Sequence, residues 1–376
     1  MAGMVSAVQS LERDFASWLS VPAAIATGFG RSAAFLAVQA VAAMSDGNAR
    51  ASEVLVPDFI CCQIPEAVRL AGATPRYYRV PRDLMIRPEH VRGYITPITS
   101  AVLVPHYFGR VQPHITELAR ACDELAIVLI EDCALALRAT SLQGQLAGTF
   151  GGLAVFSLTK SDWCYGGGLL AAREIVVARC ARALLASKFT NAPRLAWAYG
   201  LLRRADCASN RPTCARIAEL AGRRLERFCG MRGGNFYGTG RFDTSMPAFA
   251  ARRARRLLQS LPDTVARRRQ ILAAFYEALR DTPFLFRPEF DPGDVGSFLL
   301  LHAPGGNASD WREQAAAAGV TLRLVWPAYQ EPEPTQASAD LGWLAGHLLF
   351  LEIHPQLSED EVAHIVRILK NLAGHG

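Results

Sequence analysis

One stretch of the chain, residues 150–170, places a lysine beside a run of glycines. It reads FGGLAVFSLTKSDWCYGGGLL, so an apolar, strand-like run leads to Lys160 and a short polar segment leads to Gly166–Gly168. The chain has 40 basic residues, and the only other lysines are Lys188 and Lys370. Arg keeps its proton, whereas a desolvated Lys amine can lose its proton and become a nucleophile. Lys160 is therefore a candidate catalytic group.

Other polar side chains also follow predicted strands in this half of the chain. TSAVLVPHYFG predicts a strand over 101–104 with His106 after it, and AIVLIEDCALAL predicts a buried strand that ends at Asp132. Ser157 and Lys160 close the apolar run described above. Ligands of mostly parallel sheets bind at the carboxyl ends of the strands. We therefore expect these side chains to gather at one edge of a sheet.

The segment TGFGRSAAFLAVQAVAAM predicts a helix over 33–44 with small residues at its start. Bare backbone amides at such a start suit an anion. The same segment matches G-x-G-x-x-A, the dinucleotide fingerprint, which gives a nicotinamide-dependent oxidoreductase as one functional hypothesis. No clear β-branched strand precedes the glycines, and no acid is placed at the end of a second strand.

The lysine, the strand-end acid and the glycine-led helix together match the needs of pyridoxal 5′-phosphate (PLP). This cofactor uses a Lys amine for a Schiff base, a carboxylate at its pyridine nitrogen and an anion site for its phosphate. Each residue alone also has a simpler interpretation: Asp132 as a helix cap, Lys160 as a surface lysine, and Ser157 as a strand-end hydroxyl. Their order along the chain favours the cofactor interpretation.

The elements that would position these residues alternate between strands and helices over residues 53–158, which predicts an α/β fold with a mostly parallel sheet. A helix over 6–19 precedes them, and helical, Arg-rich sequence covers 173–235. A long, broken amphipathic helix over 246–280 then leads to a smaller α+β region. That region ends in a helix with a capping box.

Composition narrows the possible functions. The formal charge of +6 is mild for 376 residues, and the Arg clusters of 252–256 and 267–269 suit a solvated or interface helix face better than a nucleic-acid site. The 9 cysteines have no metal-binding spacing, and the odd count predicts reduced thiols in the cytoplasm. No secretion signal and no apolar run of membrane-spanning length is found.

Five segments in order resemble the DegT/DnrJ/EryC1/StrS aminotransferase family, which has the fold of aspartate aminotransferase (fold type I). They are GFGRSAAFLAV, VLVPDFICCQIPEAVRLAGATPRYYRV, AVLVPHYFGRVQPHITELARACDELAIVLIEDCALAL, GTFGGLAVFSLTKSDWCYGGGLL and LFLEIHPQLSEDEVAHIV. The resemblance implies a large PLP-binding α/β domain with a mostly parallel seven-stranded sheet and a smaller C-terminal α+β domain. We place these domains at residues 1–245 and 246–376.

The resemblance also implies roles for individual residues. Lys160 would carry the cofactor and later move a proton, and Asp132 would pair with the pyridinium nitrogen. Cys61 falls where many members have a ring-stacking aromatic residue, and His106 lies in a turn lining the site. The full cofactor-binding set implied is Gly30, Arg31, Ser32, Cys61, His106, Asp132, Ser157 and Lys160, with the first three and Ser157 at the phosphate.

The implied function is an aminotransferase that acts as a homodimer with its site at the subunit interface. The amino donor would be glutamate or another amino acid, and the acceptor a keto sugar in glycan or natural-product biosynthesis. The chain departs from the family pattern in three ways: Leu135 replaces a Gln, Ser157 and Lys160 are closer than usual, and TGRFDTSMPAF lacks an Asn-x-Arg segment. These departures give an alternative, a degenerate member that binds PLP or another ligand in a regulatory role without transamination.

Overall fold

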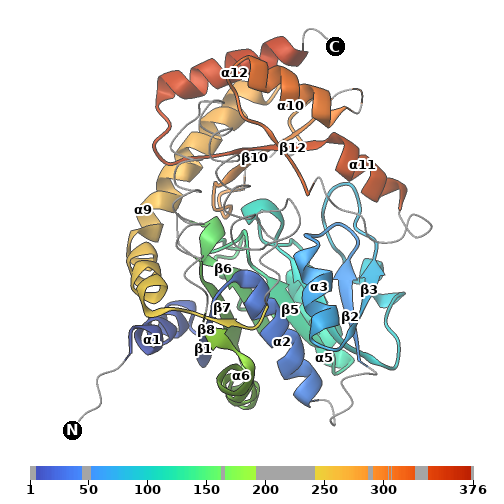
Figure 1. The fold of residues 1–376 in the computed structure, drawn as a ribbon. Coiled ribbons are helices and arrows are strands. Elements are labelled where there is room, and N and C mark those ends of the chain that lie inside the picture. Colours follow the sequence, from blue (N-terminus) through green and yellow to red (C-terminus); the bar gives the residue numbers. More distant parts are fainter. Residues whose placement is uncertain are drawn as a thin grey trace, which may run out of the picture.

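The structure is a computed structural model that describes residues 6–44, 52–161, 166–191, 242–286, 291–303, 305, 307–326 and 338–373. Strands and helices alternate in its first half, as predicted (Figure 1). The strands there are β1 (Ala23–Thr27), β2 (Glu53–Pro57), β3 (Thr74–Tyr78), β4 (Thr99–Pro105), β5 (Val128–Asp132), β6 (Leu153–Ser157), β7 (Gly168–Ala172), β8 (Thr190–Asn191) and β9 (Thr244–Ser245). The helices are α1 (Ala7–Leu19), α2 (Gly30–Met44), α3 (Gln63–Leu70), α4 (Pro88–Arg92), α5 (Ile115–Glu124) and α6 (Ile175–Lys188).

These strands form one large sheet in the order β3-β2-β4-β5-β6-β7-β1-β9-β8. Neighbours from β3 to β6 are parallel, and β7 runs antiparallel to both β6 and β1. The mostly parallel sheet is thus confirmed, and the two-residue strands β8 and β9 extend it beyond the seven strands predicted. The predicted helical sequence over 173–235 is confirmed as far as α6, and residues 192–235 lie outside the described part.

The topology argues against a dinucleotide fold at the G-x-G-x-x-A segment. That fingerprint belongs to a βαβ unit whose two strands lie in one nucleotide-binding half of a sheet. Here α2 connects β1 to β2, but β4, β5, β6 and β7 lie between these two strands in the sheet. Glycines and small residues at the start of a helix permit a close approach of backbone in many folds. The G-x-G-x-x-A match therefore did not indicate a dinucleotide-binding βαβ unit in this chain.

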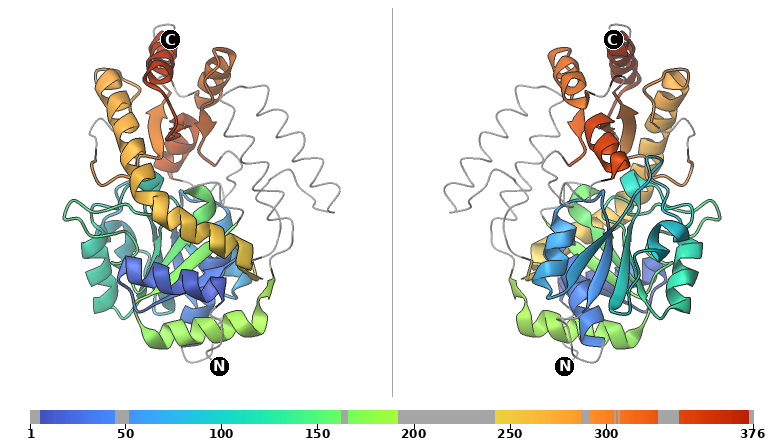
Figure 2. Two further views of the ribbon diagram at one scale, coloured as in Figure 1. Left: turned by 90° about the vertical axis from the view of Figure 1, so that its left-hand side faces the viewer. Right: turned by 90° about the vertical axis from the view of Figure 1, so that its right-hand side faces the viewer.

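Helices cover both faces of the large sheet, as Figures 1 and 2 show. Strand residues alternate between two cores: Leu129 belongs to the core that includes α1 and α5, whereas Ile130 belongs to the core that includes α2, α3 and α6. This alternation follows the two-residue period of a strand. The alternation continues to the ends of the strands. It therefore determines on which face of the sheet each polar side chain at this edge lies.

The C-terminal part forms a smaller unit around a second sheet, at the top of Figure 1. Its strands follow the antiparallel order β10-β12-β11 and pack against helices in a third core. The elements are α9 (Ala248–Leu279), β10 (Phe298–His302), α10 (Ala308–Ala317), β11 (Arg323–Leu324), α11 (Ala339–His347), β12 (Leu348–Glu352) and α12 (Glu359–Ala373). The capping box is formed: Ser358 Oγ accepts from Glu361 N, and Glu361 Oε2 accepts from Ser358 N.

Helix α9 runs from the large sheet to the small one (Figure 2). It was predicted as broken, yet it is continuous over 32 residues with Pro262 inside. Proline removes one helical hydrogen bond. Leu261 packs in the core of the large sheet, and Ile271 and Phe275 pack in the core of the small sheet. This packing on both sides of the proline stabilises the helix. Within the described residues, no helix is both long and apolar enough to cross a membrane.

Candidate active site

The carboxyl ends of β1, β5 and β6 meet at one edge of the large sheet. Asp132 is registered with Val155, two residues before the end of β6, and both Ser157 and Thr27 are registered with Gly168 of β7. The structure therefore brings Asp132, Ser157 and the start of α2 together, as expected for strand-end residues. The alanine-rich strand β1 was missing from the sequence prediction, although it delivers α2 to this edge.

The start of α2 packs directly on the end of β6. A Cβ on Gly30 would stand 2.8 Å from the Cβ and 3.1 Å from the Oγ of Ser157. A Cβ on Gly168 would stand 2.2 Å from the carbonyl oxygen of Phe29. Amides in the first turn of a helix have no partner within the helix and attract anions. The glycines thus let a helix N-terminus and a hydroxyl approach the same point.

The loop that leads into α2 is held by backbone hydrogen bonds. Gly167 N donates to Gly28 O at 2.7 Å, and Gly28 N donates to Thr244 O at 2.7 Å. The hydroxyls of Ser32 and Thr244 are hydrogen-bonded at 2.8 Å. The Ser32 hydroxyl is therefore engaged by the protein itself, which leaves its backbone amide for the predicted contact with a phosphate. Sequence reasoning missed Thr244, because nothing in its neighbourhood indicates a contact with residue 32.

The side chain of Arg31 contacts both Phe29, directly before α2, and Gln63 of α3. Its Nη1 donates to Gln63 Oε1 at 3.3 Å, and its guanidinium lies 4.7 Å above the ring of Phe29. This places a cation beside the N-terminus of α2. The positive charge adds to the helix dipole in attracting an anion.

Asp132 and Lys160 lie close enough at this edge of the sheet for the charge of Lys160 to act on the Asp132 carboxyl. Asp132 shares the strand face of Ile130, which α2 and α3 cover. Its Oδ1 accepts from Ala134 N at 2.9 Å. Burial raises the pKa of the Asp132 carboxyl above its ordinary 3.8, and the Lys160 ammonium and the Ala134 amide oppose that rise. The half-buried Lys160 ends the short 3₁₀ turn Leu158–Lys160 that follows β6.

Cys61 lies near the same lysine. It is half-buried in the loop between β2 and α3. A hydrogen bond with Cys62 and burial raise the pKa of the Cys61 thiol well above its ordinary 9.0, and the charge of Lys160 opposes them. The charge of Lys160 thus acts on both Asp132 and Cys61, and Gly30 packs on Ser157 at the same edge of the sheet.

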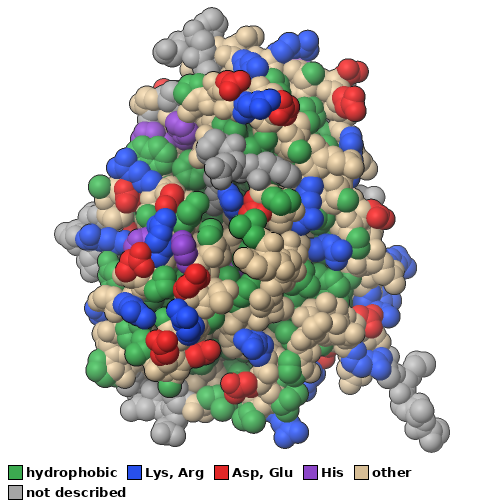
Figure 3. All heavy atoms as spheres, turned by 180° about the vertical axis from the view of Figure 1, so that it is seen from behind, with side chains coloured by type: hydrophobic (Ala, Val, Ile, Leu, Met, Phe, Trp, Pro, Cys, Tyr) green, Lys and Arg blue, Asp and Glu red, His purple; other side chains and the backbone are tan. Residues whose placement is uncertain are grey.

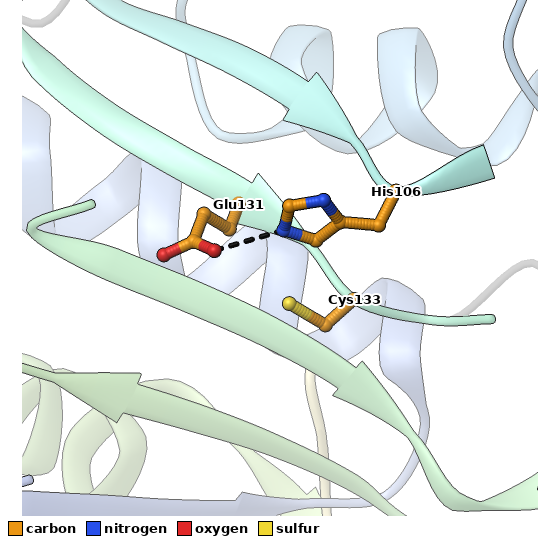
Figure 4. Close-up of side chains that lie close together, drawn as sticks. All are labelled: His106, Glu131 and Cys133. Carbon is orange, nitrogen blue, oxygen red and sulfur yellow. Dashed lines mark hydrogen bonds and ion pairs between the residues drawn. The ribbon is translucent and has the colours of Figure 1, made fainter. Parts of the chain in front are cut away.

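His106 differs from the other predicted site residues, because it is buried and both of its ring nitrogens are used. Its Nδ1 accepts from Gln112 N at 3.1 Å, and its Nε2 lies 2.8 Å from Glu131 Oε2 (Figure 4). With Nδ1 as acceptor, the proton of the neutral ring is on Nε2 and points to Glu131. The side chain has 0% exposure. This geometry favours a positioning role for His106 over the cofactor contact predicted from sequence.

Glu131 connects this histidine to the loop before β6. Besides His106, its two oxygens accept from the backbone amides of Gly148 at 2.7 Å, Phe150 at 2.7 Å and Gly151 at 2.6 Å. The carboxylate thereby fixes the loop that leads into β6, the strand that ends at Ser157 and is followed by the Lys160 turn. No role for Glu131 was predicted from the sequence. The alternation of strand faces was the signal that separates it from Asp132.

The ligand atoms of His106, Glu131 and Cys133 lie within 4.8 Å of one another, a spacing that a metal ion could use. The donors around Glu131 argue against a metal, because three amides and an imidazole already point at its oxygens. Burial raises the pKa of the Cys133 thiol well above its ordinary 9.0, which disfavours the thiolate that metals require. We therefore interpret the cluster in Figure 4 as structural.

The residues of the sheet edge fit PLP. The N-terminus of α2 with the Ser157 hydroxyl forms an anion cradle that a Cβ at Gly30 would fill. Asp132 would hold the pyridine nitrogen, and Lys160 would supply the amine. Leu135, which stands where the family pattern has a Gln, packs against the core that contains Leu129.

A large α/β sheet with these groups at its carboxyl edge and a smaller antiparallel sheet unit define a fold type I PLP-dependent transferase. The profile of the DegT/DnrJ/EryC1/StrS aminotransferase family matches residues 3–193, just over half of the chain. The chain belongs to this family, and its predicted class, an aminotransferase, is confirmed.

Relatives agree with this assignment. The chain is 27% identical to the dTDP-4-dehydro-2,3,6-trideoxy-D-glucose 4-aminotransferase of Saccharopolyspora spinosa, over 99% of this chain and 91% of that protein. It is 30% identical to the GDP-perosamine synthase of Vibrio cholerae over 46% of this chain, so it spans about half (47%) of that relative.

Solved structures support the fold. PseC of Helicobacter pylori, an aminotransferase involved in the biosynthesis of pseudoaminic acid, gives a TM-score of 0.77 at 13% identity, over 99% of this chain and 92% of that one. The aminotransferase TlmJ of Streptoalloteichus hindustanus gives 0.74 at 21% identity, over 99% and 92%. At these identities the likeness concerns the fold alone.

Proposed function

We propose that this chain is a PLP-dependent aminotransferase that transfers an amino group from an amino acid, glutamate foremost, to a keto sugar carried on a nucleotide. The convergence of Lys160, Asp132 and the Ser157–α2 cradle supports the proposal most directly. When bound, PLP supplies an aldehyde that condenses with amines and a ring that accepts electrons. Two relatives named for nucleotide-linked sugars, one with dTDP and one with GDP, support the acceptor class.

The residues of the chain divide the work. The first turn of α2 and Ser157 would anchor the phosphate, and Asp132 would keep the pyridine nitrogen protonated. Lys160, on a short turn at the same edge, is placed to hold and move a proton beside the bound cofactor. Lys160 is half-buried.

The test of the cofactor site uses the scarcity of lysine. Protein reconstituted with PLP should show a visible absorbance band, and borohydride should fix one cofactor on the peptide of Lys160. Lys160→Arg should abolish both, whereas Lys188→Arg, on α6, should change neither. A protein that stays colourless, or a label found on Lys188 or Lys370, would overturn the assignment.

The test of the reaction separates the proposal from the regulatory alternative. Glutamate, glutamine and aspartate are each mixed with the PLP-loaded protein, and conversion of the visible band to that of the amine form of the cofactor is followed. Dehydro sugars linked to dTDP or to GDP are then added, and return of the first band identifies the acceptor. PLP binding without conversion by any donor would favour the degenerate, regulatory member.

We further propose that the protein acts as a homodimer in a reducing compartment such as the cytoplasm. The described cysteines are free thiols, among them Cys61 and Cys62, adjacent residues beside the site. Light scattering of the protein with and without PLP tests the oligomeric state, and a monomer with full activity would contradict a site shared between subunits.

A further inference from the structure

The arginine run of α9, Arg267 to Arg269, donates hydrogen bonds to backbone carbonyls. Arg267 Nη2 reaches Leu357 O at 2.9 Å, and Arg269 Nη2 reaches Gly293 O at 3.1 Å. These side chains therefore pack against other parts of the chain, in agreement with the solvated or interface helix face favoured from the sequence. A few turns earlier, Arg255 of the same helix pairs with Asp14 of α1 at 2.6 Å. On the face seen in Figure 3, Lys and Arg side chains are scattered with Asp and Glu side chains among them.

Arg268, the middle residue of the run, contacts the segment that directly follows the Lys160 turn. Its side chain lies in a buried position, with the residue 8% exposed. Its Nη1 donates to Ser161 O at 2.9 Å, and its Nε donates to Ile353 O at 3.2 Å. Ser161 directly follows Lys160, and Ile353 directly follows β12 of the small sheet. One guanidinium thus connects the lysine turn to the second sheet.

The partners of Arg268 are themselves fixed. Ser161 is buried, and its N–H closes the turn by donating to Leu158 O at 3.3 Å. Ile353 N donates to Ser297 O at 2.8 Å, which ties this residue to the small unit. A Cβ on Gly296 would stand 2.7 Å from the backbone carbon of Arg268. The backbone on which Arg268 is mounted is therefore held closely as well.

Within the described residues, the turn that Arg268 contacts is also held by the buried Leu158 side chain and by a hydrogen bond between the hydroxyls of Thr159 and Ser157 at 3.0 Å. It has three residues, Leu158 to Lys160, and the Leu158 amide donates to Gly167 O at 3.0 Å. A turn this short transmits a shift of the Ser161 carbonyl directly to the Lys160 backbone. The fork of a guanidinium can hold two carbonyls in fixed directions, whereas an ammonium is a single charged point.

We propose that Arg268 is a positioning residue that holds the Lys160 turn against the small sheet, so that the Lys160 amine keeps its place near Asp132. The proposal rests on the function proposed above, in which Lys160 carries PLP. Arg268 acts through the Ser161 carbonyl and touches neither substrate nor cofactor. Its effect should therefore appear in the orientation and mobility of the lysine turn.

The experiment compares Arg268→Gln and Arg268→Lys with Arg267→Gln, a neighbour that contacts only Leu357 O among the carbonyls described above. Hydrogen exchange of the 158–161 backbone is measured without PLP. The visible circular dichroism of the PLP-loaded protein then reports the orientation of the lysine-bound chromophore. Both Arg268 variants should exchange about tenfold faster in this turn and show altered circular dichroism, and Arg267→Gln should change neither.

Arg268→Lys keeps a cation at the site, so it provides a folded variant if Arg268→Gln does not fold. Wild-type exchange and circular dichroism in either folded Arg268 variant would overturn the proposal, as would equal changes in Arg267→Gln. Failure of the proposed function would give a different result, because the wild type would then bind no PLP. The exchange measurement on the cofactor-free protein would still test whether Arg268 holds the turn.

Discussion

At the scale of single residues, the two carboxylates that end β5 show how position on a strand decides a role. Glu131 and Asp132 are adjacent, and neighbouring strand side chains point to opposite faces. Asp132 faces the side covered by α2, where the cofactor cradle lies, and Glu131 faces the side of α5, where backbone amides surround it. The sequence predicted that carboxylates lie at this edge, but their partners come from loops far along the chain.

Replacing Glu131 by Gln should destabilise the protein strongly. A Gln side chain offers one acceptor oxygen and one NH2 group, so either the amides of Phe150 and Gly151, or the amide of Gly148 and the ring N–H of His106, would face a donor while staying buried. We expect the free energy of unfolding to fall by about 3 kcal/mol, since each unsatisfied buried group costs about 1–3 kcal/mol. Urea unfolding measures this loss, with Glu124→Gln, an exposed residue, as the control. Equal stability of both variants would contradict the inference that Glu131 holds the loop before β6.

Asp58, at the end of β2, predicts a pH dependence of stability. Burial raises its pKa from 3.8 to about 6, against the amide of Val80, the hydroxyl of Ser338 and the charge of Arg79. Because the folded state binds this proton more tightly, the contribution of Asp58 to stability falls as pH rises from about 4 to about 6. The full shift corresponds to about 3 kcal/mol.

Asp58→Asn removes this titration. Its oxygen can still accept from Val80 N, and its amide can donate to Ser338 Oγ, which now donates to Asp58 Oδ2 at 3.1 Å. Urea unfolding at about pH 4 and about pH 7.5 should show the variant gaining stability relative to wild type at the higher pH. Stability curves that run parallel across this window would rule out a raised pKa at Asp58.

At the scale of elements, the sequence predicted the strands with continuous branched or leucine-rich runs and the helices with clear apolar stripes. Strands β1 and β7, AAIAT and GLLAA, were not predicted, because alanine and glycine carry little strand signal. Their small side chains allow the Phe29–Gly30 backbone to approach Gly168. The alanine and glycine residues that gave these strands little strand signal therefore also allow the close packing at the candidate phosphate cradle.

Gly30→Ala tests this cradle. The new Cβ would stand 2.8 Å from the Cβ of Ser157, so the first turn of α2 must move away from the hydroxyl. We expect the dissociation constant of PLP to rise about tenfold, which corresponds to about 1.4 kcal/mol. Titration of the visible band measures it. Gly342→Ala, within α11 and with nothing within 4 Å, should leave PLP binding unchanged and stabilise the fold by about 0.5–1 kcal/mol. Unchanged PLP affinity in Gly30→Ala would place the phosphate elsewhere.

At the scale of the whole molecule, family motifs and the alternation of elements were enough to predict the fold class, an α/β sheet with a smaller unit. They were not enough to predict how the two sheets are joined. The joining contacts link residues far apart in sequence, such as Arg268 with Ser161 and Ser338 with Asp58. No local pattern encodes such pairs. The domain boundary near residue 245 stays a prediction, and α9, which begins at Ala248, packs with both sheets.

Two ion pairs between these parts give a matched test of what holds them together. Arg110 and Asp291 lie 2.7 Å apart with side chains 18% and 10% exposed, whereas Arg82 and Asp340 lie 2.6 Å apart with 52% and 43% exposed. Water screens the second pair, and exposed pairs contribute about 0.2–1 kcal/mol. Removing one partner of the covered pair leaves the other charge in a poorly hydrated position.

Double-mutant cycles with alanine at both positions should therefore give a coupling energy of about 1–3 kcal/mol for Arg110 with Asp291 and below about 1 kcal/mol for Arg82 with Asp340. Repeating the unfolding measurements in high salt should reduce the smaller coupling further and leave most of the larger one, because ions screen exposed charges more effectively than covered ones. Equal couplings for the two pairs would mean that the distance between the charges, which the pairs share, outweighs their burial. The attachment of the 291–296 loop to the large sheet would then depend on backbone bonds such as Val295 N to Gly109 O at 3.0 Å.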